Sequence, residues 1–344
     1  MSGMRFAPAP LRSTRIAAAD LVRERPFGPG EYPILLIEAQ RPGVDLANWS
    51  ATRTADLREK LTRHGGLLFR DFAVETPGGF ARAAAAMAPD LLDYIERAAV
   101  REEVAPKVFT STELACHQRI PLHHEMSYSH NWPSQIFFYC DVAPDQGGST
   151  PVAPERAFTP HLDPAIRRRF VEHGVMYVRN FGEGVDLSWQ SAFQTTDRAE
   201  VERYCRASNT RWEWRDGDRL TTRQTRQALA RHPITGETVW FNHAHLFHES
   251  NLPPDVRASL CAALGSANLP RNAFYGDGSP IEDAVLDEIR GLYDACAFSF
   301  AWRRGDVLLL DNFLMVHGRD AFSGARRILV AMADLYTAEA GHGD

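Results

Sequence analysis

The sequence predicts a mainly β protein, with an antiparallel β core that is decorated by helices and interrupted by long insertions. Strand-like runs recur along the chain, and they do not alternate one-to-one with helices as a doubly wound parallel sheet requires. These runs cluster near the start, around residues 134–180 and at the end. We expect one domain over residues 1–344, with an irregular N-terminal segment at 1–30 and a tail at 336–344.

The predicted strands are short runs rich in β-branched, aliphatic and aromatic residues, bounded by turn-forming residues. They are Tyr32–Glu38, Gly66–Phe72, Ser134–Val142, Val175–Asn180, Thr238–His243, Asp306–Met315 and Arg327–Leu335. The predicted helices carry apolar residues at helical spacing. They are Ala55–Arg63, Gly79–Arg97, Asp197–Ser208, Pro253–Leu264 and Ile281–Ala295.

Composition excludes several classes of protein. Hydrophobic residues make up 44% and charged residues 24%, which is ordinary for a soluble globular protein. The net charge of −6 predicts no nucleic-acid partner, and the lack of a long apolar run predicts no membrane span. The five cysteines are far apart and form no Cys-x-x-Cys pair, and we recognise no secretion signal, so we expect a cytoplasmic protein.

The segment PLHHEMSY at residues 121–128 carries the most informative polar side chains. On a strand, side chains two residues apart point to the same side, so His123 and Glu125 would project together while His124 faces away. A His-x-Glu pair with one distant histidine is the ligand set that holds non-haem Fe(II) and leaves three coordination positions open. An isolated pair is more often a solvated loop, so this hypothesis needs a third ligand.

The third ligand is expected near the end of the chain. An apolar strand leads to His317, and after a short loop a second apolar strand begins with Arg326 and Arg327. This pattern predicts a hairpin that places His317 and an arginine at one mouth of a barrel. Strand alternation lets only one of the two arginines point inward, and the other is expected to be solvated.

Two His-x-Asp pairs compete with this assignment. His161 and Asp163 lie at a proline-flanked helix start, where residues two apart do not share a face. His342 and Asp344 lie in the terminal tail. We expect neither pair to bind metal.

Several ordered blocks resemble the TauD/TfdA superfamily of Fe(II)- and 2-oxoglutarate-dependent oxygenases, in its clavaminate synthase-like and syringomycin aspartate-hydroxylase-like branch. The resemblance runs from Val108 to Asp334. The blocks are LHHEMSY at 122–128, GGSTP at 147–151, GVMYVRN at 174–180, HPITGE at 232–237 with VWFN at 239–242, YGDG at 275–278 and the segment 317–326. The resemblance implies a double-stranded β-helix, or jelly-roll, core with flanking helices.

The resemblance also implies roles for particular residues. His123, Glu125 and His317 would bind Fe(II) and form the catalytic centre. Thr150 would hydrogen-bond the distal carboxylate of 2-oxoglutarate, and Arg326 would form a salt bridge to it, since a planar guanidinium matches a carboxylate. Arg327 is the alternative, one residue away.

One departure from the family concerns the last strand. Some relatives carry a second arginine there, where this chain has Val330 and Ala331. Any substrate-anchoring role of that arginine must therefore be absent or supplied elsewhere.

The implied reaction uses Fe(II), 2-oxoglutarate and O₂, and it yields succinate and CO₂ while a C–H bond of the substrate is oxidised. The branch acts mainly on amino acids in specialised metabolism such as antibiotic biosynthesis. We expect hydroxylation of an amino acid or amino-acid-derived substrate, free or bound to a carrier protein, with desaturation, epoxidation and ring closure as open alternatives. The candidate substrate-contacting residues are Met126, Ser127, Trp240 and Asn242.

Two other functions use the same scaffold. A zinc or nickel cupin-type hydrolase or isomerase would share the three ligands, and such metals bind many sites more tightly than Fe(II). That function would not explain Thr150 and Arg326. A catalytically inactive binding protein is the other alternative, and the intact set of ligands argues against it.

Overall fold

The largest sheet has eight strands in the order β1-β2-β3-β16-β7-β19-β5-β4 and is antiparallel except for the β2–β3 pair. The computed structural model describes residues 21–338 apart from residues 95, 100, 113, 183 and 185. The strands are β1 Val22–Phe27, β2 Ile34–Ala39, β3 Gly66–Arg70, β4 Glu103–Ala105, β5 Val108–Thr110, β7 Asn131–Val142, β16 Val307–Asp311 and β19 Arg327–Thr337.

A three-stranded sheet, β6-β17-β9, packs against one face of the large sheet. Its strands are β6 Ile120–His123, β9 Val152–Pro154 and β17 Met315–Arg319. Buried side chains such as Phe138 of β7, Leu308 of β16 and Met315 of β17 form one apolar cluster between the two sheets. Two sheets packed around an apolar core are the arrangement of a jelly roll. The predicted mainly β core is therefore confirmed.

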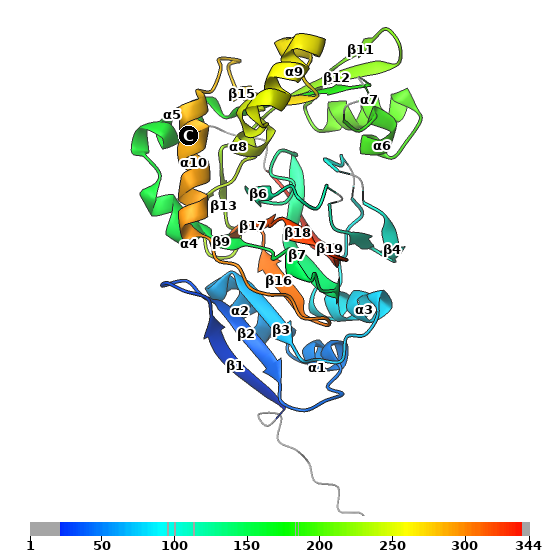
Figure 1. Cartoon of the computed structure of the whole chain (residues 1–344), viewed down its shortest axis with the longest axis vertical. Coiled ribbons are helices and arrows are strands. Elements are labelled where there is room, and N and C mark those ends of the chain that lie inside the picture. Colours follow the sequence, from blue (N-terminus) through cyan, green and yellow to red (C-terminus); the bar gives the residue numbers. More distant parts are fainter. Residues whose placement is uncertain are drawn as a thin grey trace, which may run out of the picture.

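The other face of the large sheet is covered by helices. They are α1 Leu46–Ala51, α2 Thr54–His64 and α3 Pro77–Met87, which lie beside β1, β2 and β3 in Figure 1. Alternate residues of β7 serve the two faces, because successive side chains of a strand point in opposite directions. Phe138 packs in the cluster between the sheets, whereas Phe137 and Tyr139 pack with Trp49 and Phe80 under the helices.

An insertion builds a second, four-stranded antiparallel sheet, β11-β12-β10-β15, at the upper end of the molecule in Figure 1. Its strands are β10 Val175–Phe181, β11 Arg211–Arg215, β12 Arg219–Arg226 and β15 Arg271–Tyr275. Two strand pairs complete the sheets: β13 Leu229–Arg231 with β14 Thr238–Trp240, and β8 Gln146–Gly147 with β18 Phe322–Ser323.

The remaining helices connect the strands of the core and of the insertion. They are α4 Glu155–Phe158, α5 Pro164–His173, α6 Trp189–Phe193, α7 Arg198–Ala207, α8 Ala244–Phe247, α9 Pro254–Leu264 and α10 Asp283–Cys296, with 3₁₀ turns η2 Thr159–His161, η3 Glu249–Asn251 and η4 Ser266–Asn268. Within the described residues, no helix is both long and apolar enough to cross a membrane.

Two predicted elements are shorter than expected. The helix predicted over Gly79–Arg97 ends at Met87, because Pro89 disfavours helical geometry at Ala88, which adopts φ −141° and ψ 99°. The strand predicted over Asp306–Met315 is interrupted by a turn after Asp311, and β17 begins only at Met315.

The predicted hairpin is wrong. The strand that carries His317 pairs with β6 and β9, whereas β19 pairs with β7 and β5 in the large sheet. The chain therefore crosses from one sheet to the other after Arg319 instead of folding back on itself. Close approach of β17 to β6 needs a glycine, because a Cβ atom at Gly318 would lie 2.6 Å from the carbonyl oxygen of Ile120.

Within the described residues, strands extend further toward both chain ends than expected. The segment 1–30, predicted to be irregular, contains β1 at Val22–Phe27, and the predicted tail at 336–344 includes the last two residues of β19. Residues 1–20 and 339–344 lie outside the described part of the chain.

Candidate metal centre

The structure brings His123, Glu125 and His317 together. His123 ends β6 and is the register partner of His317 in the middle of β17. Their ring centroids are 4.6 Å apart, and Oε2 of Glu125 lies 3.7 Å from Nε2 of His317. One ligand atom from each side chain lies within 4.8 Å of the others. Among the described residues, this is the only such group of three His, Cys, Asp or Glu side chains.

Both histidines are set to act as neutral ligands. Nδ1 of His123 donates to the carbonyl oxygen of Pro121 at 2.8 Å, so the lone pair resides on Nε2. Burial, reinforced by His317, lowers the pKa of His123 to about 3. Burial likewise lowers the pKa of His317, although Glu125 opposes this shift. Two uncharged imidazoles and one carboxylate are the donor set that suits non-haem Fe(II).

Glu125 is held as a carboxylate by Arg101. Nη2 of Arg101 lies 3.1 Å from Oε1 and 3.0 Å from Oε2 of Glu125, and both side chains are buried. Burial alone would raise the pKa of Glu125, but Arg101 and then His317 outweigh it and lower that pKa. The charged form of Glu125, which a metal ion requires, is therefore present at neutral pH.

The strand that was expected to carry both His123 and Glu125 ends at His123, and Glu125 lies in a turn. A buried asparagine fixes the backbone that follows β6. Asn312 Oδ1 accepts the N–H of Glu125 at 2.8 Å, and Nδ2 donates to the carbonyl oxygens of Glu125 at 2.9 Å and Pro133 at 2.8 Å. His124 faces away and donates from Nδ1 to the carbonyl oxygen of Asn312 at 2.6 Å.

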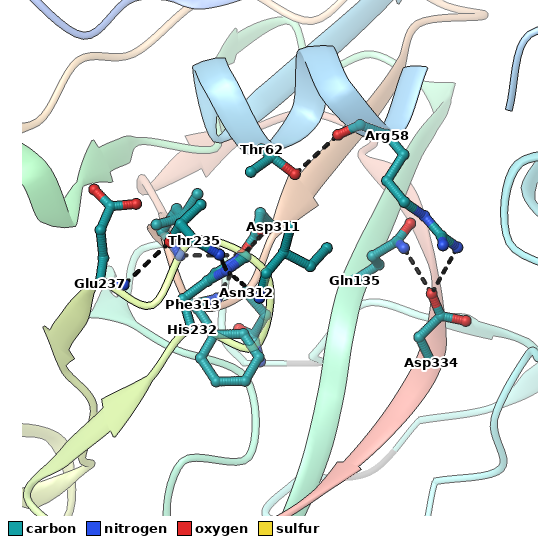
Figure 2. A network of polar contacts seen from close by, with 12 residues as sticks. Arg58, Thr62, Gln135, His232, Thr235, Glu237, Asp311, Asn312, Phe313 and Asp334 are labelled. Carbon is teal, nitrogen blue, oxygen red and sulfur yellow. Dashed lines mark hydrogen bonds and ion pairs between the residues drawn. The ribbon is translucent and has the colours of Figure 1, made fainter. Parts of the chain in front are cut away.

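Asp311 shapes the turn that presents Asn312, as Figure 2 shows. Asp311 Oδ1 accepts the N–H of Phe313 at 3.0 Å, and Oδ2 accepts from Nε2 of His232 at 2.9 Å. The tautomer of His232 is fixed because its Nδ1 accepts the N–H of Thr235 at 3.0 Å. These contacts give the HPITGE block a structural task, which is to brace the turn between β16 and β17.

A narrow cavity opens beside the two histidines. Among the residues that the structure describes, those lining the cavity are Arg101, Ser111, Thr112, Ile120, His123, Phe138, Thr150, His317, Gly318, Arg319, Arg326, Ile328 and Val330. Oγ1 of Thr150 accepts from Nε1 of Trp302 at 3.1 Å. The hydroxyl proton of Thr150 therefore remains available for donation to an anion in the cavity.

The two neighbouring arginines have opposite surroundings. Arg326 lines the cavity, and its Nε donates to the carbonyl oxygen of Gly148 at 2.8 Å. Arg327 is exposed and pairs with Asp141 at 2.8 Å. The Gly-Gly pair permits the approach of Arg326. A Cβ atom at Gly148 would lie 3.0 Å from Cδ of Arg326, and the φ of Gly148 is +63°. Burial, together with Arg319, lowers the pKa of Arg326 to about 10, so it stays charged at neutral pH.

Arg319 closes another side of the cavity through backbone contacts. Its Nη1 donates to the carbonyl oxygens of Thr112 at 3.3 Å and Leu114 at 3.0 Å. Its Nη2 donates to those of Ala115 and Gln118, both at 2.9 Å. Arg319 therefore holds the loop that precedes β6 against β17.

The four candidate substrate residues do not line this cavity. Trp240 is fully buried and packs edge-to-face on Phe170. Asn242 bonds backbone groups at Ala228 and residue 244. Met126 is buried, and Oγ of Ser127 lies 3.0 Å from Nδ1 of His243. Their predicted contact with substrate therefore gains no support from the cavity, because these side chains are committed to packing and to internal hydrogen bonds.

The competing pair at 161–163 serves the backbone. Nδ1 of His161 bonds the carbonyl oxygen of Ala157 at 2.9 Å. Asp163 caps α5 by accepting the N–H of Ala165 at 2.6 Å. The pair at 342–344 lies outside the described residues.

Sequence reasoning did not find Arg101, Asn312 and Arg319. All three are buried and polar, and each bonds a segment distant in the chain. No spacing rule marks such a contact, so only the position of Asn312 and Arg319 on either side of His317 gave a usable hint.

The fold and the triad define a class of protein, a jelly-roll protein with the ligand set of a non-haem iron enzyme. Residues 24–333 match the family described as "Taurine catabolism dioxygenase TauD, TfdA family". The chain therefore belongs to the TauD/TfdA family, and the match begins well before Val108, where the sequence blocks placed the resemblance. It is a 2-oxoglutarate-dependent dioxygenase, with Fe(II) as its metal and 2-oxoglutarate and O₂ as cosubstrates.

Individual relatives agree with this assignment. The dapdiamide synthesis protein DdaC of Enterobacter agglomerans is 38% identical over 310 residues, which cover 90% of this chain and 94% of that protein. A clavaminate synthase-like protein of Arabidopsis thaliana is 35% identical over 286 residues, which cover 79% of this chain and 82% of that protein.

Solved structures share the fold. The crystal structure of the PvcB protein from Pseudomonas aeruginosa matches with a TM-score of 0.53 and 17% identity, over 93% of this chain and 94% of that one. The structure of AAD-2 in complex with Mn(II) and N-oxalylglycine matches with a TM-score of 0.53 and 12% identity, over 91% and 96% of the two chains. These likenesses support the jelly-roll core.

Proposed function

We propose that this dioxygenase hydroxylates an unactivated C–H bond of an amino acid or an amino-acid-derived substrate in specialised metabolism. The observation that carries the proposal is the placement of the His123, Glu125 and His317 cluster beside a cavity that also contains Thr150 and Arg326. The likeness to DdaC, whose name refers to dapdiamide synthesis, and to a clavaminate synthase-like protein supports this class of substrate.

In this proposal each site residue has a separate task. His123, Glu125 and His317 hold Fe(II), which supplies the chemistry that couples O₂ to 2-oxoglutarate and to the substrate. Thr150 donates its hydroxyl proton to the distal carboxylate of 2-oxoglutarate. Arg326 neutralises that carboxylate, and its bond to Gly148 keeps the guanidinium in place.

The cellular setting is part of the same proposal. We infer a single domain that works in the cytoplasm on a free substrate or one tethered to a carrier protein. All five cysteines lie in the described part of the chain and none is in a disulfide, which supports a reducing compartment.

The test has two stages. Under anaerobic conditions, Fe(II) and 2-oxoglutarate should together produce a visible charge-transfer band, and Glu125→Ala should not produce it. Admission of O₂ with a library of amino acids, offered free and as pantetheine thioesters, should release succinate and add the mass of one oxygen atom to the true substrate. A protein that gives no band would contradict the proposal, and succinate release with a substrate that loses two hydrogens would replace hydroxylation by desaturation.

A further inference from the structure

Arg101 is a buried cation beside the metal centre that has hydrogen-bond donors to spare. Its residue exposure is 7%, and only Nη2 contacts Glu125. The Nε and Nη1 atoms are buried and have no partner among the described residues. A guanidinium has five N–H donors and no way to lose its charge, so buried donors without partners call for a ligand.

The position of Arg101 is fixed before any ligand arrives. Its guanidinium carbon lies 4.5 Å from the ring centroid of Tyr94, and its carbonyl oxygen accepts from Nη1 of Arg97 at 3.2 Å. The loop itself is tied to the insertion sheet. Arg179 of β10 donates to the carbonyl oxygen of Arg97 at 2.9 Å, and Arg271 of β15 donates to that of residue 98 at 3.1 Å. A cation that is held in this way loses little freedom on binding an anion.

The cavity carries more positive charge than the cosubstrate needs. Among the described residues that line the cavity, three are arginines and none is acidic. Arg319 bonds four backbone carbonyls, and Arg326 is the partner proposed for the distal carboxylate of 2-oxoglutarate. Val330 lines the same cavity at a position where some relatives place an arginine. Arg101, whose acidic contact is the candidate metal ligand Glu125, is therefore the arginine with donors left for another anion.

We propose that Arg101 binds a carboxylate of the substrate and thereby holds the neighbouring C–H bond at the metal centre. Nη1, which has no partner among the described residues, would donate to this carboxylate while Nη2 keeps its contact with Glu125. This inference rests on the proposed function, because it presupposes a substrate that is oxidised beside Glu125. It deepens that function by stating which group of the substrate is recognised and by which residue.

The test compares two probes that differ only in charge. The enzyme is loaded with Mn(II) and the 2-oxoglutarate analogue N-oxalylglycine, and calorimetry then measures the binding of N-acetyl-L-alanine and of N-acetyl-L-alaninamide. We expect the carboxylate to bind the unaltered enzyme at least ~10-fold more tightly than the amide, in line with one charge-assisted pair. Equal binding of both probes, or binding of neither, would overturn the proposal.

Variants assign that preference to Arg101. Arg101→Gln should abolish the preference for the carboxylate, whereas Arg203→Gln, which changes an exposed arginine of α7, should preserve it. Arg101→Lys keeps a positive charge next to Glu125 but lacks the second, separate amino group that Nη1 supplies, so we expect it to bind Mn(II) and to lose most of the preference. It therefore decides the matter if Arg101→Gln fails to fold or to hold metal.

Two further measurements separate the competing explanations. If Arg101→Gln and Arg101→Lys weaken N-oxalylglycine binding as much as they weaken carboxylate binding, Arg101 serves the cosubstrate and the proposal is wrong. The charge-transfer band of the unaltered enzyme with Fe(II) and 2-oxoglutarate tests the proposed function independently. A normal band without any preference for the carboxylate probe would overturn the role of Arg101 alone.

Discussion

Arg326 and Arg327 are adjacent in the chain, yet one lines the cavity and the other pairs with Asp141 at the surface. We therefore expect Arg326→Ala to weaken 2-oxoglutarate binding severely and to leave iron binding largely intact. Removal of one partner from a buried charge-assisted pair typically costs about 3–5 kcal/mol. Titration of the anaerobic Fe(II) protein with 2-oxoglutarate measures the loss.

Arg327→Ala is the matched control for this prediction, because an exposed ion pair contributes little to binding or stability. Its affinity for 2-oxoglutarate should equal that of the unaltered enzyme. If Arg327→Ala lost the cosubstrate and Arg326→Ala kept it, the assignment of the two arginines would be reversed.

His161 has the sequence pattern of a metal ligand but the surroundings of a surface residue. Its ring is exposed and bonds the carbonyl oxygen of Ala157, and Asp163 caps α5. His161→Ala should therefore leave both iron content and succinate formation unchanged, whereas His123→Ala should lose the iron. Metal analysis of the two purified variants provides the comparison, and loss of iron from His161→Ala would rule out the proposed triad.

The sequence was enough to single out three side chains that the structure brings together, because the spacing of His123 and Glu125, the apolar strand before His317 and the family blocks around them are local patterns. The partners of those ligands were not predictable. Arg101 and Asn312 reach Glu125 from positions 24 and 187 residues away. Such contacts depend on the folded path of the chain and leave no periodic trace in the sequence.

At the scale of elements, the turn between β16 and β17 determines how Glu125 is presented. Asn312→Ala would leave the N–H of Glu125 and the carbonyl oxygen of Pro133 without their buried partner. A buried polar group without a partner typically costs about 1–3 kcal/mol. We expect a lower melting temperature together with weaker Fe(II) binding.

A lower melting temperature and weaker Fe(II) binding in Asn312→Ala would not alone show that Asn312 positions Glu125, because a general loss of stability could cause both. Asn312→Asp retains the acceptor for the Glu125 N–H, but its second oxygen would face the carbonyl oxygens of Glu125 and Pro133, so it should be at least as destabilised as Asn312→Ala. If the bond to the Glu125 N–H positions the carboxylate, Asn312→Asp should nevertheless bind Fe(II) more tightly than Asn312→Ala. Both should be measured below the melting temperature of the less stable variant. Normal Fe(II) affinity in Asn312→Ala would show that the turn does not position Glu125.

Elements with local signals were predictable, and those that depend on sheet pairing were not. The strand at Ser134–Val142 and the helix at Asp197–Ser208 match β7 and α7 closely, because apolar and capping residues mark their limits. The hairpin after His317 was wrong, because an apolar strand, a loop and a second apolar strand look the same whether the two strands pair or lie in different sheets.

At the scale of the whole molecule, the jelly roll places the two candidate histidine ligands on the small sheet and Glu125 in the turn after β6. The proposed cosubstrate arginine, Arg326, lies directly before β19 of the large sheet. The insertion sheet then contributes Arg179 and Arg271, which secure the loop that carries Arg101. Parts of three sheets therefore build and support the site, in which His317 is buried and His123 is partly buried, and the neighbouring His243 and His245 are buried as well.

This burial predicts how the stability of the metal-free protein depends on pH. Burial lowers the pKa of His245 to about 4 and that of His123 to about 3, and it lowers the pKa of His243. The unfolded chain takes up protons on these histidines near pH 6.5, whereas the folded protein does not. Their contribution to stability is thus complete above about pH 6.5 and is lost as the pH falls toward the folded pKa values.

We therefore expect the melting temperature of the metal-free protein to fall steadily between about pH 7 and pH 5. Each such histidine should lower the free energy of unfolding by up to about 1.4 kcal/mol per pH unit over this range. The pKa of Glu237 is lowered to about 2, so this residue also loses its stabilising effect as the pH falls, but only below the pH range in which an ordinary glutamate titrates. It therefore does not affect the melting temperature between pH 7 and pH 5. His245→Gln should make the dependence shallower, because one buried histidine is removed, and His161→Gln at the surface should leave it unchanged. A melting temperature that stayed constant over this range would mean that the buried imidazoles accept protons without unfolding the protein.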